Sequence, residues 1–182
     1  PDGALFSADF RAPERLFSLL LQAAGRAGRD AQLGAAQACE MWVQTFHPDH
    51  PVFEYLKRHD FAGFAAQQLQ EREQAGLPPF SFQALLRAEA RTQQAAQDFL
   101  KAAKALGEAR LAADAGVLSV YPAVPMSMQR VANVERAQML VESHSRKHLQ
   151  QFLAAWQEDL QQLRTQHKAV LRWAIDVDPL AI

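Results

Sequence analysis

The sequence predicts an α+β fold, and two observations support this prediction. From residue 80 onward, some segments carry apolar residues with the period of a strand and others with the period of a helix. These segments follow in the order strand, helix, strand, strand, helix, strand, which is the ferredoxin-like βαββαβ pattern. In such a domain, two helices cover one face of an antiparallel sheet. The 182 residues, 49% of them hydrophobic, are enough for one domain or two small ones.

Local signals place the elements of this second half. We expect strands at residues 82–89, 117–121, 135–142 and 170–177. Pro122 and Pro125 predict a loop after the second strand. Thr92 can cap a helix that runs to about Leu106, and Ser145 can cap the other helix. The apolar stripe of that other helix has nearly ideal helical spacing. It consists of Leu149, Phe152, Leu153, Trp156, Leu160 and Leu163.

The first 60 residues carry helical signals and one strand signal. Pro13 suits the first turn of a helix, because its missing N–H group would have no partner there. Residues 36–46 predict a strand with Met41 and Val43 on one face. A short helix is expected at residues 52–56.

A helix and a proline-rich connector follow. Asp60 can cap this helix at its start and Gly76 at its end. The connector, Leu77-Pro78-Pro79-Phe80, is expected to be extended, because each proline fixes its own φ and restricts the preceding residue. We therefore expect three parts: residues 1–60, a connecting part at 61–79, and a C-terminal domain at 80–182.

Composition restricts the class of protein. The net charge of −1 excludes a strongly basic DNA-coating protein, so a nucleic-acid surface has to be a local patch. The single cysteine, Cys39, cannot form an internal disulfide, and within an apolar strand it predicts a core residue. We find no membrane span and no signal peptide, and a reducing cytoplasm fits. Since the chain begins with Pro1 in what reads as mid-domain sequence, we expect a piece of a longer protein.

The sharpest motif is the run Gln22-Ala23-Ala24-Gly25-Arg26-Ala27-Gly28-Arg29. Two arginines three residues apart, near a helix end loosened by glycines, can point toward one anion. Arginine suits phosphate because its planar guanidinium donates two parallel hydrogen bonds and stays charged. Gln22 can orient a water or contact a phosphate oxygen. The same run also fits an ordinary helix end whose arginines face solvent. The pattern resembles motif VI of superfamily 2 helicases, the arginine-finger helix of the second RecA-like lobe.

The flanking residues extend this resemblance. The stretch Ser7-Ala8-Asp9-Phe10-Arg11-Ala12-Pro13-Glu14-Arg15-Leu16-Phe17 leads directly into the motif. Further matching stretches are Thr45-Phe46-His47-Pro48, the helix with Glu71 and Arg72, Leu77-Pro78-Pro79-Phe80, residues 136–141, and Asp176-Val177-Asp178-Pro179. In this order, and over nearly the whole chain, the sequence resembles the PriA family of primosomal replication-restart helicases.

The resemblance implies a function for each part. Residues 1–60 would be the C-terminal part of a RecA-like second helicase lobe, with Gln22, Arg26 and Arg29 in nucleotide binding and catalysis. ATP and Mg²⁺ would be bound mainly by the first lobe, and zinc by an upstream module, so we expect no cofactor in this chain. The chain also has no Gly-x-x-x-x-Gly-Lys phosphate loop, and we expect no ATP hydrolysis by it alone.

The C-terminal domain would bind branched or forked DNA. Its scattered cations are Arg130, Arg136, Arg146, Lys147, Arg164, Lys168 and Arg172. Of these, Arg136, Arg146 and Lys147 are the predicted DNA contacts, although a charge-mixed solvated surface is an alternative interpretation. The sequence departs from the family at two places, with Ala137 in place of an aromatic residue and Tyr121-Pro122 in place of glycine-proline.

The resemblance also implies partners and a location. We expect primosome proteins and single-strand-binding protein as partners, no membrane, and a bacterial, nucleoid-associated cytoplasmic location. An alternative function is a non-catalytic protein-interaction or structural module that braces the helicase. A further alternative is an α+β domain with a chance motif. His47 and His50 suggest a metal site only weakly, because no third ligand stands nearby, and Asp176 and Asp178 are expected to be a solvated end. We therefore predict no metal site.

Overall fold

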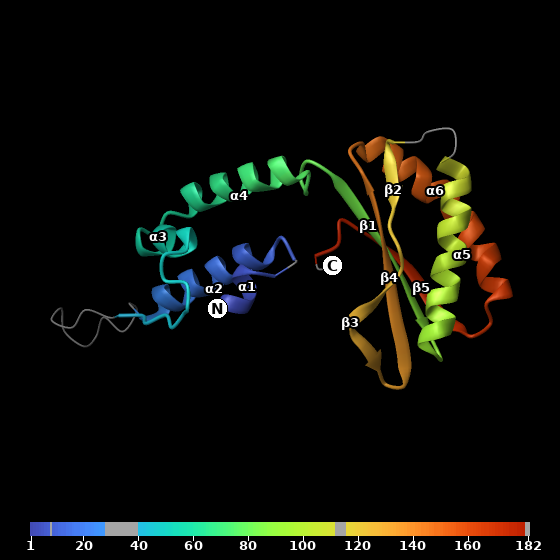
Figure 1. The fold of residues 1–182 in the computed structure, drawn as a ribbon, viewed down its shortest axis with the longest axis horizontal. Coiled ribbons are helices and arrows are strands. Elements are labelled where there is room, and N and C mark those ends of the chain that lie inside the picture. The colour runs from blue at the N-terminus through green and yellow to red at the C-terminus, as the bar shows by residue number, and fades with distance from the viewer. Residues whose placement is uncertain (8, 28–39, 112–115, 181–182) are drawn as a thin grey trace. The chain divides into compact units, whose positions relative to one another are not determined.

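The computed structural model describes residues 1–7, 9–27, 40–111 and 116–180. These residues form two compact units, residues 1–77 and 78–180, each of which is described by itself (Figure 1). The first unit is helical and the second combines helices with an antiparallel sheet, so the α+β prediction is confirmed. The first unit contains α1 (Asp2–Leu5), α2 (Ala12–Ala27), α3 (Pro51–Lys57) and α4 (Phe61–Ala75).

Aromatic stacking forms the centre of the first unit. Phe17 on α2 is fully buried, and its ring stacks on that of Phe64 on α4 with centroids 4.3 Å apart. The other buried members of this core are Val52, Phe53 and Leu56 of α3. The expected caps of α4 are present, because Asp60 accepts a hydrogen bond of 2.8 Å from the Gly63 amide and Gly76 has a φ of 64°.

The strand predicted at residues 36–46 is wrong where it can be examined. Residues 36–39 lie outside the described part, and residues 40–46 are irregular. Met41 and Val43 nevertheless pack against the core, as the alternating pattern predicted, while Trp42 is 88% exposed. A strand needs a neighbour for its backbone hydrogen bonds, and the described residues provide none for this segment.

The extended connector predicted after α4 is also wrong. Pro78 and Pro79 form a turn, and the peptide bond between them is cis. The extended conformation was expected from proline's restricted φ, which does not determine the isomer of the bond between two prolines.

The sheet of the second unit has the ferredoxin-like strand order. Its elements are β1 (Phe82–Ala90), α5 (Gln93–Leu111), β2 (Leu118–Val120), β3 (Val124–Val131), β4 (Val134–Ser143), α6 (Arg146–Gln166) and β5 (Val170–Val177). The sheet order is β2-β4-β1-β5, all pairs are antiparallel, and β3 pairs with β4 beyond the end of β2. Figure 1 shows α5 and α6 together on one face of this sheet.

The strand β3 corrects the prediction of a loop around Pro122 and Pro125. It forms a hairpin with β4 through Ala132 and Asn133, whose φ values of 49° and 63° suit a tight two-residue turn. Its pairing with β4 is irregular between Pro125 and Arg130, consistent with a proline that cannot donate to a regular ladder.

The helices and the sheet enclose one apolar core. Trp156 on α6 is fully buried and donates a hydrogen bond of 3.0 Å from Nε1 to the Ala103 carbonyl on α5. The Thr92 hydroxyl accepts from the Ala95 amide at 3.2 Å and Ser145 accepts from the His148 amide at 3.4 Å, as predicted. The helix after Thr92 is longer than expected and ends at Leu111. The expected stripe of α6 is entirely buried.

Candidate functional site

Residues 22–27 of the motif lie at the end of α2. Gln22 and Arg26 are exposed and lie one helical turn apart, so they share a face of α2. No described carboxylate pairs with Arg26, and its guanidinium can therefore accept an anionic partner. Among the described residues, none would lie within 4 Å of a Cβ at Gly25. Arg29 lies outside the described residues.

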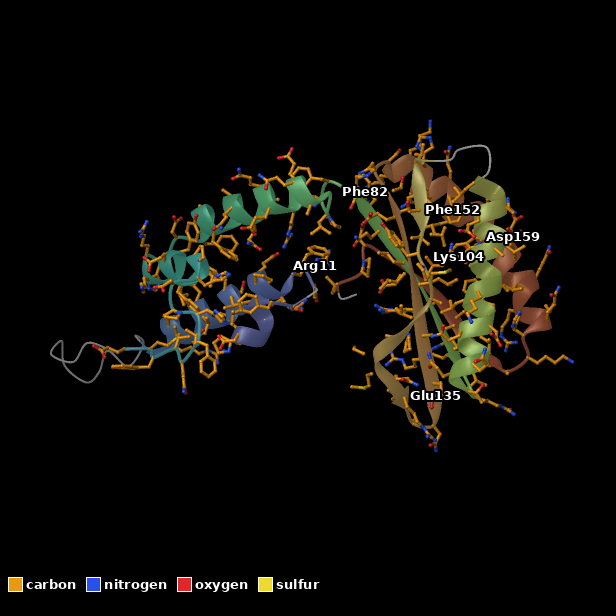
Figure 2. The ribbon with its side chains drawn as sticks, viewed as in Figure 1. Arg11, Phe82, Lys104, Glu135, Phe152 and Asp159 are labelled. Carbon is orange, nitrogen blue, oxygen red and sulfur yellow. The ribbon has the colours of Figure 1, made fainter. Side chains whose placement is uncertain are left out.

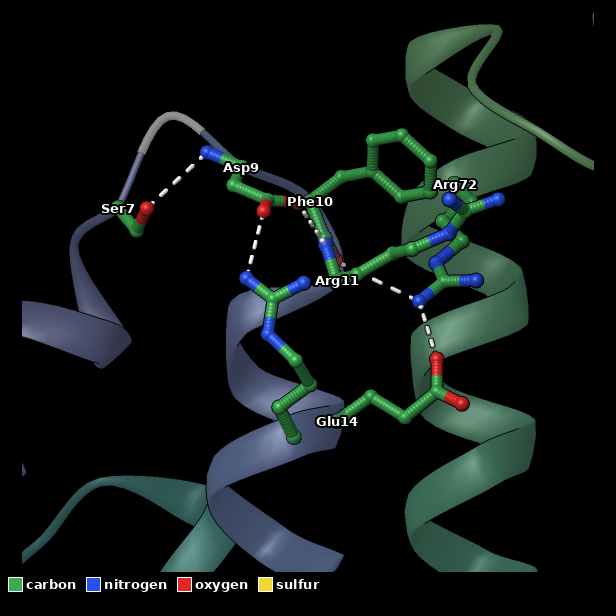
Figure 3. Close-up of polar contacts among 7 residues, drawn as sticks. Ser7, Asp9, Phe10, Arg11, Glu14 and Arg72 are labelled. Carbon is green, nitrogen blue, oxygen red and sulfur yellow. Dashed lines mark hydrogen bonds and ion pairs between the residues drawn. The ribbon is translucent and has the colours of Figure 1, made fainter. Parts of the chain in front are cut away.

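The loop before α2 is held by Asp9. Its carboxylate accepts a hydrogen bond of 2.9 Å from the Arg11 amide and one of 2.6 Å from the Arg15 guanidinium, and the Ser7 hydroxyl accepts from the Asp9 amide (Figure 3). Burial alone would raise the pKa of Asp9, but the hydrogen bonds from Arg15 and Arg11 outweigh it and hold the pKa below its ordinary value. A charged Asp9 thus fixes the chain at the start of α2.

Arg72 connects α4 to the same loop. Its guanidinium donates a hydrogen bond of 2.8 Å to Glu14 and one of 3.4 Å to the Phe10 carbonyl, and it lies 4.9 Å from the centre of the Phe10 ring. Arg11 approaches that ring at 5.0 Å, so two guanidiniums contact one phenyl group (Figure 3). Only 13% of the Arg72 side chain is exposed. The family resemblance covered Arg72 without giving it a role, and the structure makes it a positioning residue for the start of α2.

A pocket of about 420 Å³ lies beside α3 and is unrelated to the predicted residues. It is lined mainly by apolar side chains, among them Met41, Val43, Phe53 and Leu56. Gln22 and Arg26 do not line it. Its composition suits apolar packing better than the binding of a phosphate.

The three predicted DNA contacts fall at two different ends of the sheet. Arg136 lies near the start of β4, next to the β3–β4 turn, whereas Arg146 and Lys147 begin α6, after β4 has ended. Arg136 and Ser143 are seven residues apart in one strand, which corresponds to roughly 20 Å. Arg146 and Lys147 thus lie close together, and Arg136 is not part of their patch.

Arg136 belongs to a row of three charged residues on neighbouring strands. Glu89 on β1 is in register with Arg136 on β4 and with Arg172 on β5. The ion pairs measure 2.9 Å from Arg172 Nη2 and 3.6 Å from Arg136 Nε, both to Glu89 Oε1. The row lies on the face away from α5 and α6, since the alternate residues Ala88 and Ala90 belong to the helix-covered core.

We call this end of the sheet the basic end, where β1 and β3 finish and β4 and β5 begin. Its cations are Arg91, Arg130, Arg136, Lys168 and Arg172, and its carboxylates are Glu89 and Glu135. Glu135, labelled in Figure 2 near the tip of the hairpin, pairs with Arg130 at 3.7 Å. The Arg91 amide donates to the Ala169 carbonyl, which brings Arg91 close to Lys168. No described carboxylate pairs with either of these two cations.

The opposite end of the sheet carries more carboxylates. Arg146 pairs with Asp178 at 3.4 Å and stacks on the Phe82 ring at 4.7 Å, so it is already engaged. Glu142 accepts hydrogen bonds from Ser81, Gln83 and Tyr121. Its negative charge raises the pKa of Tyr121. The exposed Lys147, in contrast, has no ion pair within the described residues.

The residues considered as metal ligands have other contacts. The His47 and His50 rings lie 4.7 and 6.4 Å from the Phe6 ring, and His50 Nδ1 accepts from the Val52 amide at 3.3 Å. Asp176 pairs with Arg87 at 3.0 Å, as Asp178 does with Arg146. In the described ranges, no group of three or more His, Cys, Asp or Glu side chains gathers in one place. Cys39 lies outside these ranges.

Comparison with known proteins identifies the family. Residues 73–180, more than half of the chain, match the model of the family described as the primosomal protein N C-terminal domain. The chain belongs to the PriA family. The matched residues include all of β1 to β5 and therefore both ends of the sheet. The match begins within α4, after Arg72.

Relatives in this family extend the similarity to the motif on α2. The chain is 39% identical over 178 residues to the replication restart protein PriA of Haemophilus influenzae, covering 98% of this chain and 23% of that protein. The PriA of Synechocystis sp. is 33% identical over 181 residues, covering 100% and 20%, respectively. The chain thus spans about one fifth to one quarter of the length of these relatives. Of its described helices, none is both long and apolar enough to cross a membrane.

Proposed function

We propose that this chain is the C-terminal part of an ATP-dependent DNA helicase that recognises stalled or abandoned replication forks and promotes replication restart. The observation that carries the proposal is its similarity to replication restart proteins named PriA over 98–100% of its length, with motif and domain in one alignment. In this proposal α2 contributes nucleotide-contacting residues and the second unit contacts DNA. ATP and Mg²⁺ would be bound mainly by other parts of the intact protein, and zinc by a separate module.

Three features support a nucleotide-contacting role for α2. Gln22 and Arg26 are exposed on one face, and no described carboxylate competes for Arg26. The start of the helix is held in place by Asp9 and Arg72. A helix fixed at its start can hold an arginine toward a bound phosphate without reorganisation during the reaction. We include Arg29 in this role on the basis of the family motif.

DNA binding by the second unit is supported by exposed cations at both ends of the sheet. We propose that Arg136, Arg146 and Lys147 contact phosphates of branched or forked DNA. We also propose that primosome proteins and single-strand-binding protein are partners of the intact helicase. Phosphate contacts fix orientation without reading sequence, so binding should show little base preference.

A fluorescence-anisotropy titration of the 182-residue chain with forked DNA at several salt concentrations tests this proposal. Each phosphate contact contributes about one to the slope of log affinity against log salt. Replacing Arg136, Arg146 and Lys147 together with alanine should flatten that slope. An unchanged slope would contradict these contacts, and the absence of any salt-dependent binding would contradict DNA binding by this chain.

One observation favours the second candidate, a protein-interaction module. The hairpin strand β3 exposes apolar side chains, with Val124 49%, Met128 63% and Val131 39% exposed. Exposed apolar residues close together are typical of protein contacts. Replacing Met128 with glutamine should leave DNA affinity unchanged in either case, and should weaken primosome assembly by the intact helicase only if the hairpin binds a partner.

A further inference from the structure

We infer that the basic end of the sheet is the part of the proposed DNA-binding surface that contributes most to binding nucleic-acid phosphates, and that Glu89 is an internal counter-ion that weakens this binding. The inference rests on the proposed DNA-binding function, and it names the surface and the residue that regulates it. Arg172 and Glu89 were not among the predicted contacts, and Arg146 and Lys147 lie at the other end of the sheet.

Two arginines share one carboxylate in this row. Arg172 and Arg136 both pair with the same oxygen of Glu89, from opposite sides and in direct register. Both guanidiniums are permanent cations, and hydrogen bonding to Glu89 raises the pKa of Arg172 further. One carboxylate is therefore the counter-ion of two guanidiniums, and the row of three residues has a net charge of +1.

The three residues of the row differ in their exposure to solvent. The Arg172 side chain is 73% exposed, whereas those of Arg136 and Glu89 are each 24% exposed. Arg172 can therefore turn toward an acceptor in solution, while Arg136 and Glu89 stay close to the sheet. Arg91 and Lys168 are exposed beside this row and have no described carboxylate partner. Cations thus outnumber carboxylates at this end.

A phosphate can replace Glu89 as the partner of Arg172. A phosphate diester and a carboxylate both present oxygens that accept hydrogen bonds from guanidinium. An incoming phosphate can take over the hydrogen bond that Arg172 now donates to Glu89. The exchange leaves the Glu89 carboxylate close to the bound phosphate, and like charges repel. Glu89 therefore opposes binding in two ways, by holding Arg172 in the free protein and by repelling the phosphate in the complex.

The opposite end of the sheet lacks this positive excess. Glu142, Asp176 and Asp178 lie on strands or strand ends at this end, and Arg146 is occupied by Asp178 and the Phe82 ring. Arginine and lysine thus outnumber carboxylates at the basic end, whereas carboxylates offset the cations at the opposite end. A polyanion binds where opposing carboxylates are fewest.

The chain offers a matched control for each substitution. Arg110 on α5 pairs with Asp159 on α6, on the helix-covered side of the second unit, and Asp159 raises the pKa of Arg110 as Glu89 does that of Arg172 (Figure 2). Asp159→Asn and Glu89→Gln change the net charge equally. Arg110→Ala and Arg172→Ala likewise remove one paired arginine each.

The experiment is an anisotropy titration of the 182-residue chain and its variants with labelled forked DNA, at about 50 and 200 mM salt. Glu89→Gln should tighten binding about two- to fivefold, the range corresponding to one partly exposed ion pair. Arg172→Ala should weaken binding and lower the salt slope by about one. Asp159→Asn and Arg110→Ala should alter neither the affinity nor the slope beyond the change caused by net charge alone.

Each contrary result has a distinct meaning. The wild-type chain could bind forked DNA while Glu89→Gln behaves like its control Asp159→Asn, and Arg172→Ala like its control Arg110→Ala. In that case the basic end does not bind the DNA, although the proposed function stands. If the wild-type chain shows no salt-dependent binding, the proposed function itself fails. A competition experiment compares polyglutamate with unlabelled DNA of equal charge. If the two displace the labelled DNA equally, the assignment of this surface to nucleic acid is overturned. Arg172→Ala keeps the test decisive if Glu89→Gln does not fold, because Arg172 is mostly exposed.

Discussion

Arg72 on α4 donates a hydrogen bond of 2.8 Å to Glu14 on α2, and the same guanidinium contacts the Phe10 ring and carbonyl. One largely buried side chain thus connects α4, the last helix of the first unit, to the start of the helix that carries Gln22 and Arg26. Since sequence positions 14 and 72 are far apart, this contact closes a long loop of chain. The orientation of α2 therefore depends on α4.

We predict that Arg72→Ala destabilises the first unit by about 1.5–3 kcal/mol, the range for a hydrogen bond to a charged group. Arg72→Lys should recover only part of this loss, because an ammonium cannot match the planar guanidinium that stacks on Phe10. Amide exchange along α2 would measure the effect, with faster exchange at its first turns. Arg58→Ala serves as the control, because Arg58 is 72% exposed and its contact with Glu54 is 3.9 Å long. Equal exchange in the Arg72 and Arg58 variants would contradict the prediction.

Acid should loosen the loop before α2 through Asp9. The folded-state pKa of Asp9 lies below its ordinary value, so its ionised form stabilises the fold above that value of about 3.9. This contribution is lost as the pH falls through the depressed folded-state pKa. Asp9→Asn should therefore reduce stability near neutral pH and flatten its decline below about pH 4. Urea unfolding monitored at a series of pH values would test this, and parallel curves for the two proteins would argue against it.

The buried indole of Trp156 should contribute to the second unit through a specific hydrogen bond. Trp156→Phe removes the donor to the Ala103 carbonyl, which is expected to cost about 1–3 kcal/mol in addition to any loss of packing. Trp173→Phe is the matched control, because Trp173 is only partly buried and has no hydrogen bond from its indole among those described. Thermal unfolding of both variants gives the comparison. A larger loss of stability for Trp173→Phe would contradict this role of the indole hydrogen bond.

Sequence signals succeeded where structure depends on neighbouring residues. Ser145 and Thr92 cap their helices as expected, and the apolar stripe of α6 follows directly from helical periodicity. Sequence signals failed where the structure depends on pairing with a distant strand. The alternation around Met41 correctly gave the buried side of the segment but not its conformation, because a strand also requires a hydrogen-bonding neighbour.

The same distinction applies to the candidate site. Arginines can be counted in a sequence, but only strand register shows that Glu89 lies between Arg136 and Arg172. The strand predicted at residues 135–142 already placed Arg136 at its start and Arg146 after its end, but only strand pairing shows which residues neighbour Arg136. The β3–β4 hairpin was hidden for another reason. Its prolines indicate a loop, and only its pairing with β4 makes it a strand.

The last prediction concerns Arg26 and Arg29 in the intact helicase. An arginine finger stabilises charge that develops on the transferred phosphoryl group, so its contribution is larger in the transition state than in substrate binding. In nucleotide hydrolases such a finger contributes roughly 10³–10⁵ in rate. Arg26→Ala or Arg29→Ala should therefore reduce turnover far more than it weakens binding of ATP or DNA, with the larger effect expected at Arg29.

Steady-state ATPase kinetics with saturating forked DNA, together with anisotropy measurements of DNA affinity, would test this expectation. Lysine at either position should rescue poorly, because an ammonium cannot reproduce the two parallel hydrogen bonds of a guanidinium. Arg15→Ala is a useful comparison on the same helix, since Arg15 pairs with Asp9 and its loss should act through the position of α2. A finger variant should keep the stability and amide exchange of the parent, whereas Arg15→Ala should change both. Near-normal turnover in both finger variants would refute the assignment of residues 22–29 to nucleotide contact.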